Sequence, residues 1–212
     1  MTRHILAAML AAIPLCAAEP EKSAVKISFV VFVDNDSGVS EASCGWGSGT
    51  VIHSGDGKSL ILTNRHVCPN GNGHPFVLIG GKSHPAEWIA ADDVADLALV
   101  RVPVELPAVE LAASEPEEGT TLRQWGYSGR GPMKPKTGPH LGTVKIKAED
   151  GTTLQSLLTG IGVEPADSGA GVFDPDGKLT AVTYAVGGEK GGKQREHCVR
   201  LPDIKRFLSQ HR

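Results

Sequence analysis

Three residues far apart in the chain, His66, Asp96 and Ser168, have the side chains that acyl transfer by serine requires. That chemistry needs a hydroxyl nucleophile, a base that takes its proton, and a carboxylate that holds the base in one tautomer. His66 ends a strand-like run, Asp96 opens the run Leu-Ala-Leu-Val, and Ser168 lies in a turn of small residues before another strand. Each alone could be incidental, but the three settings together predict a catalytic triad.

Other residues offer competing chemistry. Asp92 and Asp93 rival Asp96, but neither is followed directly by the apolar strand, so both are interpreted as solvated loop charges. A zinc site would need more than His66 and Cys68, and the chain contains no Cys-x-x-Cys pair. We therefore predict no metal and no cofactor.

The elements that must position the triad are short strands joined by turns. Apolar and β-branched runs separated by Gly, Pro, Asn and Asp predict an antiparallel all-β fold, because no crossover helices lie between them. Only the tail from Pro202 has helical spacing. The expected strands cover residues 25–33, 49–52, 60–63, 76–79, 86–91, 97–102, 121–127, 141–147, 155–159, 171–173, 179–186 and 197–201.

Two segments lack a strand pattern. Residues 106–119 are rich in proline and acid and lie near the middle of the chain, where a linker between two β lobes is expected. Residues 128–140 are the most loop-like stretch of the sequence.

Composition excludes several function classes. The chain of 212 residues is 40% hydrophobic and 21% charged, as in globular proteins. A formal net charge of −3 gives no basic face for nucleic acid. No apolar run reaches the length of a spanning helix, so stable membrane insertion is not expected.

Residues 1–18 have the pattern of a secretory signal peptide. A short basic start precedes an apolar run and a small-residue exit, which predicts cleavage after Ala18 or one residue earlier. Cys16 also allows a lipid anchor, but the residues before it do not suit one. Export to the periplasm or the medium would leave Cys44, Cys68 and Cys198 in an oxidising compartment.

The motifs around the three residues resemble the trypsin-like serine peptidase family, in particular exported bacterial members such as the HtrA-like peptidases. The similarity rests on Gly-Ser-Gly-Thr-Val-Ile (47–52), Leu-Thr-Asn-Arg-His-Val (62–67), Ala-Asp-Leu-Ala-Leu-Val (95–100) and Asp-Ser-Gly (167–169). It implies two six-stranded antiparallel β-barrels with a cleft between them and a C-terminal helix. It also implies that residues 19–212 form one endopeptidase domain acting on protein or peptide substrates.

The same resemblance implies roles for further residues. A disulfide is expected between Cys44 and Cys68, with Cys198 left as a buried thiol. The oxyanion hole would use the amides of Ala166 and Ser168. The pocket for the residue before the cut would be formed by Gly162, Val163, Thr183, Tyr184 and Ala185. Because no acid stands at the expected floor, the preference would be for small or medium aliphatic residues.

The chain departs from the family around the serine. The motif Gly-Asp-Ser-Gly-Gly reads Ala166-Asp167-Ser168-Gly169-Ala170 here, and alanine at 166 predicts a strained oxyanion hole and low basal activity. No Ile-Val-Gly-Gly start is present to pair with Asp167, for which Arg65 is one candidate partner. A PDZ module after the helix, as in HtrA-like proteins, is not expected.

Two other functions remain open. A peptidase fold with an altered serine turn could be a weak or inactive binding module. An esterase of the α/β-hydrolase type would need Gly-x-Ser-x-Gly, whereas alanines flank Ser168 at these positions.

Overall fold

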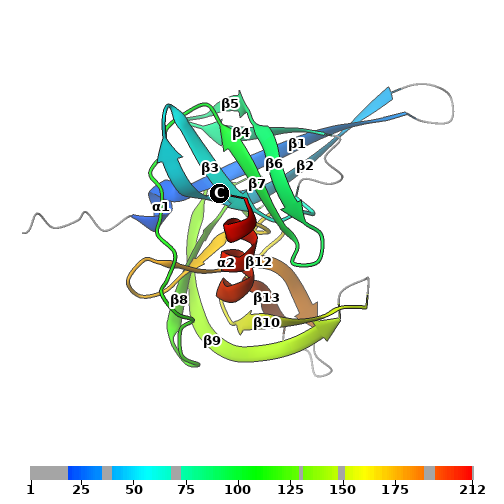
Figure 1. Cartoon of the computed structure of the whole chain (residues 1–212). Helices are drawn as coiled ribbons and strands as arrows, with labels where there is room; N and C mark the ends of the chain where they lie inside the picture. Colours follow the sequence, from blue (N-terminus) through cyan, green and yellow to red (C-terminus); the bar gives the residue numbers. More distant parts are fainter. Residues whose placement is uncertain are drawn as a thin grey trace, which may run out of the picture.

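The computed structural model describes residues 19–34, 40–67, 73–128, 131–147, 151–188 and 194–211, and these form two lobes of antiparallel strands (Figure 1). The first lobe follows the short helix α1 (Pro20–Ser23). Its strands are β1 (Ala24–Asp34), β2 (Ser40–Gly55), β3 (Lys58–Thr63), β4 (His74–Ile79), β5 (Lys82–Pro85), β6 (Glu87–Asp92) and β7 (Leu97–Val102). The second lobe consists of β8 (Thr121–Gly126), β9 (Lys134–Lys147), β10 (Thr153–Thr159), β11 (Gly171–Phe173), β12 (Leu179–Gly188) and β13 (Gln194–Arg200), followed by α2 (Leu201–Gln210).

The first lobe is a curled seven-stranded sheet in the order β5-β4-β1-β2-β3-β7-β6. The all-β prediction is confirmed, but the expected closed barrel of six strands is not what this lobe forms. β5 and β6 are separated only by Ala86, yet they lie at opposite edges of the sheet. The Ala86 amide donates to the Pro75 carbonyl on β4 at 2.9 Å, which continues the β4–β5 pairing into the bend between β5 and β6.

The second lobe is a closed barrel in the order β10-β13-β12-β11-β8-β9. Its β9 corrects one expectation, because residues 134–139 lie in the segment expected to be a loop and instead pair with β8. Pro135 and Pro139 obscured this strand in the sequence. The Pro139 carbonyl accepts from Gly160 N–H, so the backbone polar groups of this residue point away from β8 and its missing N–H costs no ladder bond there.

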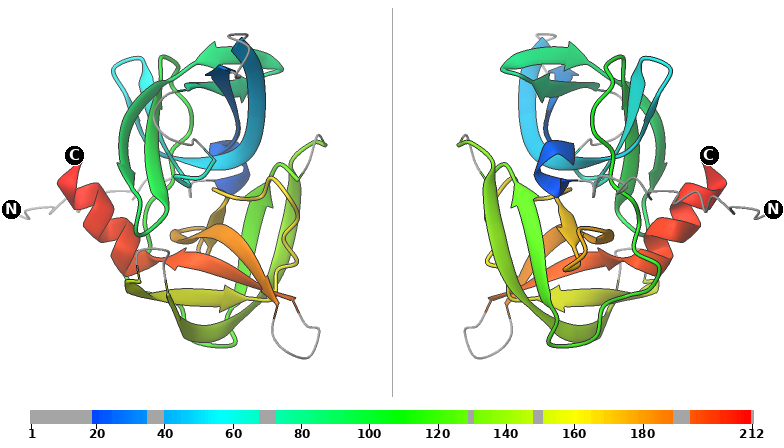
Figure 2. Two further views of the ribbon diagram at one scale, coloured as in Figure 1. Left: turned by 90° about the vertical axis from the view of Figure 1, so that its right-hand side faces the viewer. Right: turned by 90° about the vertical axis from the view of Figure 1, so that its left-hand side faces the viewer.

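One apolar cluster joins the lobes to the C-terminal helix. Leu62, Leu97 and Leu99 of the first lobe pack with Phe173 and other barrel residues. Ile204, Phe207 and Leu208 of α2 complete the cluster, which confirms the helical spacing of the tail. The two views in Figure 2 show α2 lying beside the junction of the two lobes. Burial of this shared core fixes the lobes against each other.

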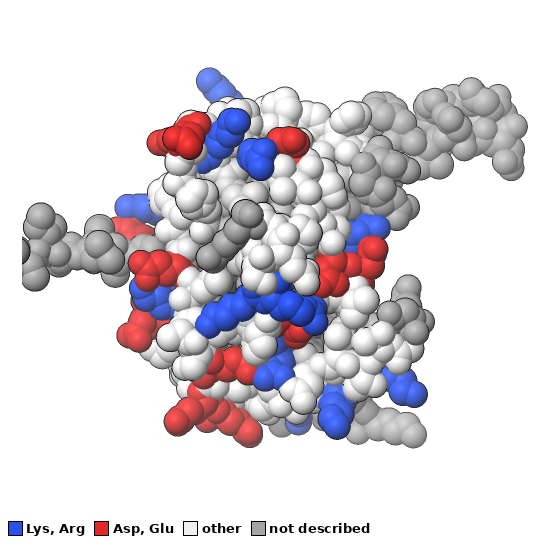
Figure 3. Space-filling view, in the orientation of Figure 1, with Lys and Arg blue, Asp and Glu red and all other residues white. Residues whose placement is uncertain are grey.

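Charges of both signs mix on the surface. On the face that Figure 3 shows, a short band of Lys and Arg crosses the middle of the molecule with acidic side chains on either side. Ion pairs such as Arg206–Asp92 and Arg200–Glu115 connect such groups. In the part of the chain that the structure describes, no helix is long and apolar enough to cross a membrane.

Candidate active site

His66 and Asp96 form a tight pair at the edge of the first lobe. The Asp96 carboxylate accepts from His66 Nδ1 at 2.6 Å and from the His66 backbone amide at 2.9 Å. Its own carbonyl accepts from the Asn64 side chain at 2.9 Å and from Arg65 N–H at 3.2 Å. The turn after β3 is therefore wrapped around Asp96, which adopts φ +53°, a left-handed conformation that aspartate tolerates. This arrangement fixes the ring of His66 and leaves its Nε2 for other chemistry.

The neighbouring acids have different roles from Asp96. Asp92 Oδ1 accepts from the amides of Val94 and Ala95, so Asp92 shapes the turn that leads to Asp96. It is thus more than the solvated loop charge that the sequence suggested. Asp93 is exposed, as predicted, and pairs with Arg65 at 2.8 Å.

Ser168 is held in place by strand β2 of the other lobe. The Ser48 amide donates to the Ser168 carbonyl at 2.8 Å, and the Ser48 hydroxyl donates to the Ala166 carbonyl at 3.0 Å. The approach is so close that a Cβ on Gly169, which has φ +85°, would lie 2.1 Å from the Ser48 carbonyl oxygen. Only glycine fits after the serine. Ser48, which the sequence analysis missed, thereby connects the two lobes at the candidate nucleophile.

The residues before Ser168 form a tight turn over residues 164–167. Asp167 N–H donates to the Glu164 carbonyl at 3.0 Å. Pro165 occupies the second position and Ala166 the third, where its φ is +77°. Positive φ at the third position defines a type II turn, in which glycine is preferred. The alternative type I turn has negative φ there and turns over the peptide between the second and third residues, which would reverse the Ala166 N–H.

Asp167 is buried beneath this turn. Its carboxylate lies 2.6 Å from Lys136 Nζ and accepts from the Ser128 hydroxyl at 3.0 Å and from Glu164 N–H at 2.8 Å. The suggestion that Arg65 pairs with Asp167 is therefore wrong, because Arg65 is paired with Asp93 and the cation comes from β9. The Ser128 hydroxyl, and next the Lys136 ammonium, hold the pKa of Glu164 below its usual value.

Two cavities have His66 on their walls. The smaller, of about 280 Å³, has both His66 and Ser168 on its wall, together with Phe29, Cys44 and Trp46. The candidate nucleophile and base therefore face one space, although they come from different lobes.

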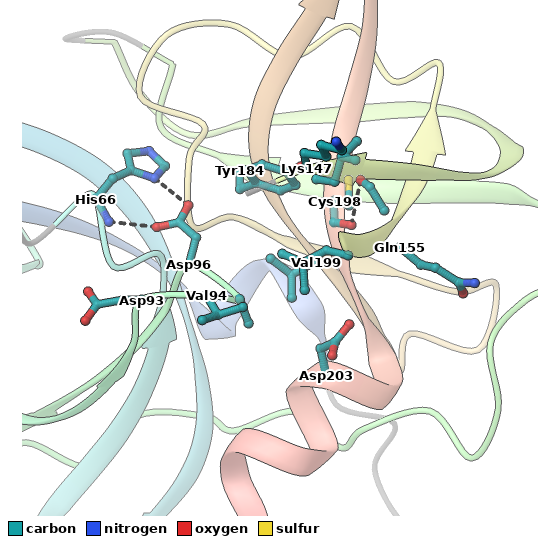
Figure 4. Close-up of a pocket in the computed structure, with 14 residues that line it drawn as sticks. His66, Asp93, Val94, Asp96, Lys147, Gln155, Tyr184, Cys198, Val199 and Asp203 are labelled. Carbon is teal, nitrogen blue, oxygen red and sulfur yellow. Dashed lines mark hydrogen bonds and ion pairs between the residues drawn. The ribbon is translucent and has the colours of Figure 1, made fainter. Parts of the chain in front are cut away.

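The larger cavity, of about 650 Å³, lies between the His66–Asp96 pair and the barrel. Figure 4 shows the pair on one side and Tyr184, Cys198 and Val199 on the other. Its remaining apolar lining comes mainly from Val94, Ala95, Ile146 and Leu154. Burial raises the pKa of Tyr184 and of Asp203 on its wall. This space beside the pair has both apolar and charged side chains on its wall and is large enough to hold part of a ligand.

The predicted pocket residues are only partly brought together. Tyr184 lines the larger cavity, whereas the Thr183 side chain is buried and its hydroxyl donates to Gln124. Val163 packs against a barrel core cluster, and Gly162 is exposed. The side chain of Ala185 lies outside the described residues.

A buried acid near the predicted pocket floor escaped the sequence analysis. The carboxylate of Glu196 accepts from the amides of Ile161 and Gly162, both at 3.0 Å, and from the Thr159 hydroxyl at 3.2 Å. The charge is thus stabilised by three donors of the protein itself. Because Glu196 lies on β13, far from residue 162 in the sequence, the sequence alone gave no signal for this contact.

The cysteine predictions are partly testable. Cys44 is exposed and is not part of a disulfide in the structure, so the predicted link to Cys68 is not shown. Cys68 and the signal segment 1–18 lie outside the described residues, and the disulfide therefore stays a prediction. Cys198 is a free, fully buried thiol whose pKa is raised to about 12 by burial, as expected for an inert core residue. Among the described residues, no group of three His, Cys, Asp or Glu side chains is placed to hold a metal ion.

Two antiparallel β lobes, with a His–Asp pair on one and a serine turn on the other, define the class of trypsin-like serine peptidases. The chain belongs to this family: the model of the trypsin-like peptidase domain matches residues 47–182.

Known proteins resemble this chain in sequence or in fold. The chain is 23% identical over 155 residues to HhoA of Synechocystis sp. (strain PCC 6803), assigned as a serine protease; the match covers 70% of this chain and 39% of HhoA. The Rv3671c protease of M. tuberculosis, in its active form, has a TM-score of 0.76 at 22% identity, covering 91% of this chain and 82% of that one. The HtrA-type protease AlgW, solved with a decapeptide, also has a TM-score of 0.76 at 17% identity, covering 91% and 65%. This chain thus spans about two fifths of the length of HhoA.

Proposed function

We propose that this protein is a serine endopeptidase with His66, Asp96 and Ser168 as its catalytic triad. The observation that carries the proposal is the 2.6 Å contact between His66 Nδ1 and Asp96 Oδ2, with His66 and Ser168 on the wall of one cavity. Membership of the trypsin-like peptidase family supports the same assignment.

The reaction follows from the chemistry of these groups. Ser168 Oγ attacks the scissile carbonyl carbon, and its proton passes to His66 Nε2. The imidazolium that forms is stabilised by the Asp96 carboxylate and then gives its proton to the leaving amine. The resulting acyl ester on Ser168 is hydrolysed by a water molecule, which His66 activates in the same way. The free serine and a new carboxyl group are the products.

The amides of Ala166 and Ser168 would stabilise the oxyanion. In the described residues, neither amide donates a backbone hydrogen bond, so both are free to do so. Ala166 has φ +77°, and the glycine that stands at this position in the family motif would adopt this backbone conformation without strain. We expect a competent triad whose basal activity is lowered by the cost of this conformation.

The substrate is proposed to be a protein or peptide, cut after small or medium aliphatic residues. No acid stands at residues 162 or 163, and the charge of Glu196 is already stabilised by amides and a hydroxyl. A peptide-library cleavage profile tests this preference. A profile dominated by arginine or lysine would contradict it and implicate Glu196.

The triad is tested by labelling with a fluorophosphonate probe and mapping the modified residue. We expect a single adduct on Ser168, which is lost in Ser168→Ala and strongly slowed in His66→Ala. Ser209→Ala, an exposed serine on α2, is the matched control and should label normally. Absence of labelling in the folded wild-type protein would favour the alternative, an inactive binding module.

Export is proposed from residues 1–18, with the mature chain beginning at Glu19 or one residue earlier. Expression of the full chain in a Gram-negative host and N-terminal sequencing of the periplasmic fraction test this. Recovery of the uncleaved chain from the cytosol would contradict it.

A further inference from the structure

The Asp167 carboxylate is fully buried directly beside the candidate nucleophile, and a buried charge persists only when it is paired and hydrogen-bonded. Two hydrogen-bond donors, the Ser128 hydroxyl and the Glu164 amide, contact it. The charge itself is neutralised by Lys136, whose Nζ lies 2.6 Å away and whose side chain is 11% exposed. Lys136 is therefore the group that allows Asp167 to remain in the interior.

Strands β8 and β9 form a socket for this carboxylate. Lys136 is paired with Gln124 across the two strands, and Gly126 ends β8 two residues later. A Cβ on Gly126 would lie 2.2 Å from Asp167 Oδ1, so only glycine leaves room for the acid. The absence of a side chain at Gly126 thus leaves room for the carboxylate, and the Lys136 ammonium supplies the opposite charge.

Lys136 also reaches the other end of the serine turn. Its Nζ lies 3.7 Å from the Glu164 carboxylate, so one ammonium contacts the first and last residues of the turn over 164–167. Between them lies Ala166, held at φ +77°. Any movement of Asp167 out of its socket must displace Ala166 and Ser168, because both are bonded to it in the chain.

We propose that Lys136 is a positioning residue that holds the serine turn in its type II form, and with it the two amides that stabilise the oxyanion. The inference rests on the proposed peptidase function. It assigns to a side chain of the barrel, rather than to a chain terminus, the charge that keeps Asp167 buried. Lys136 does not contact the larger cavity, so its effect should fall on kcat and not on KM.

The test compares Lys136→Met with Lys134→Met, an exposed lysine two residues earlier on β9. Loss of one oxyanion donor slows turnover by about 100- to 1,000-fold. We expect Lys136→Met to lower kcat and the rate of fluorophosphonate labelling by at least about 100-fold, with KM changed less than about threefold. Lys134→Met should match the wild type, and Lys136→Arg should recover much of the loss because it keeps the charge. If Lys136→Met folds and turns over within about threefold of the wild type, the proposal is wrong.

A second variant separates positioning from general destabilisation. Asp167→Asn keeps an acceptor for Ser128 and Glu164 but removes the charge that Lys136 neutralises. We expect the double variant Asp167→Asn/Lys136→Met to be at least about tenfold more active than Lys136→Met, even where the single variant does not fold. A double variant that is no better than Lys136→Met would also overturn the proposal. Failure of the wild type to label at Ser168 would instead refute the proposed function.

Discussion

Replacement of Ala166 by glycine is expected to raise turnover. Ala166 adopts φ +77°, a conformation that costs a residue with a Cβ about 1–2 kcal/mol and costs glycine little. At about 1.4 kcal/mol per factor of ten, that penalty shifts the ratio of type II to type I turn by about 5- to 30-fold. We expect this penalty to populate the type I form in solution beside the type II form of the structure, so that its removal by glycine raises kcat by up to this factor. KM should change little, because the cavity beside His66 is not altered.

The assay is steady-state cleavage of a fluorogenic peptide, combined with the rate of fluorophosphonate labelling. Ala170→Gly is the matched control, since the same substitution is made four residues later in a buried position without positive φ. It should lower stability by about 1 kcal/mol and not raise kcat. An unchanged or lower kcat in Ala166→Gly refutes the reasoning. The turn would then already be fully in its type II form, and Ala166 would simply be tolerated.

Three further outcomes are expected. Asp96→Asn removes the carboxylate that orients His66 and should slow labelling of Ser168 by about 1,000- to 10,000-fold without unfolding; a loss below about tenfold would argue against the triad. Because the pKa of Cys198 is raised to about 12, its thiol stays protonated in the folded state while the unfolded thiol ionises above pH 9. The free energy of unfolding should therefore fall by about 1.4 kcal/mol per pH unit above pH 9, and Cys198→Ala should remove this part of the slope in urea titrations. In unreduced exported protein, mass mapping should find Cys44 joined to Cys68, a link worth about 3 kcal/mol, and an alkylated Cys44 would contradict the pairing.

The sequence predicted those parts of the protein that depend on local pattern. Runs of β-branched residues between turn residues indicated the all-β fold, and the spacing of Ile204, Phe207 and Leu208 indicated the final helix. His66, Asp96 and Ser168 could be selected because each lies in a short motif next to a strand end. The strand over residues 134–140 was missed because its prolines argue against a strand unless the direction of each backbone group is known.

Only the tertiary structure decided which distant groups meet. The partner of Asp167 is Lys136, 31 residues away in the sequence, on a strand that the sequence pattern did not indicate. Glu196 reaches the amides of residues 161 and 162 because β13 pairs with β10 in the closed barrel. The curled sheet of the first lobe is likewise set by which strand edges approach each other. Local patterns encode the geometry of one strand or turn, whereas the partner of a buried charge depends on strand order and register, which are determined by packing of the whole chain.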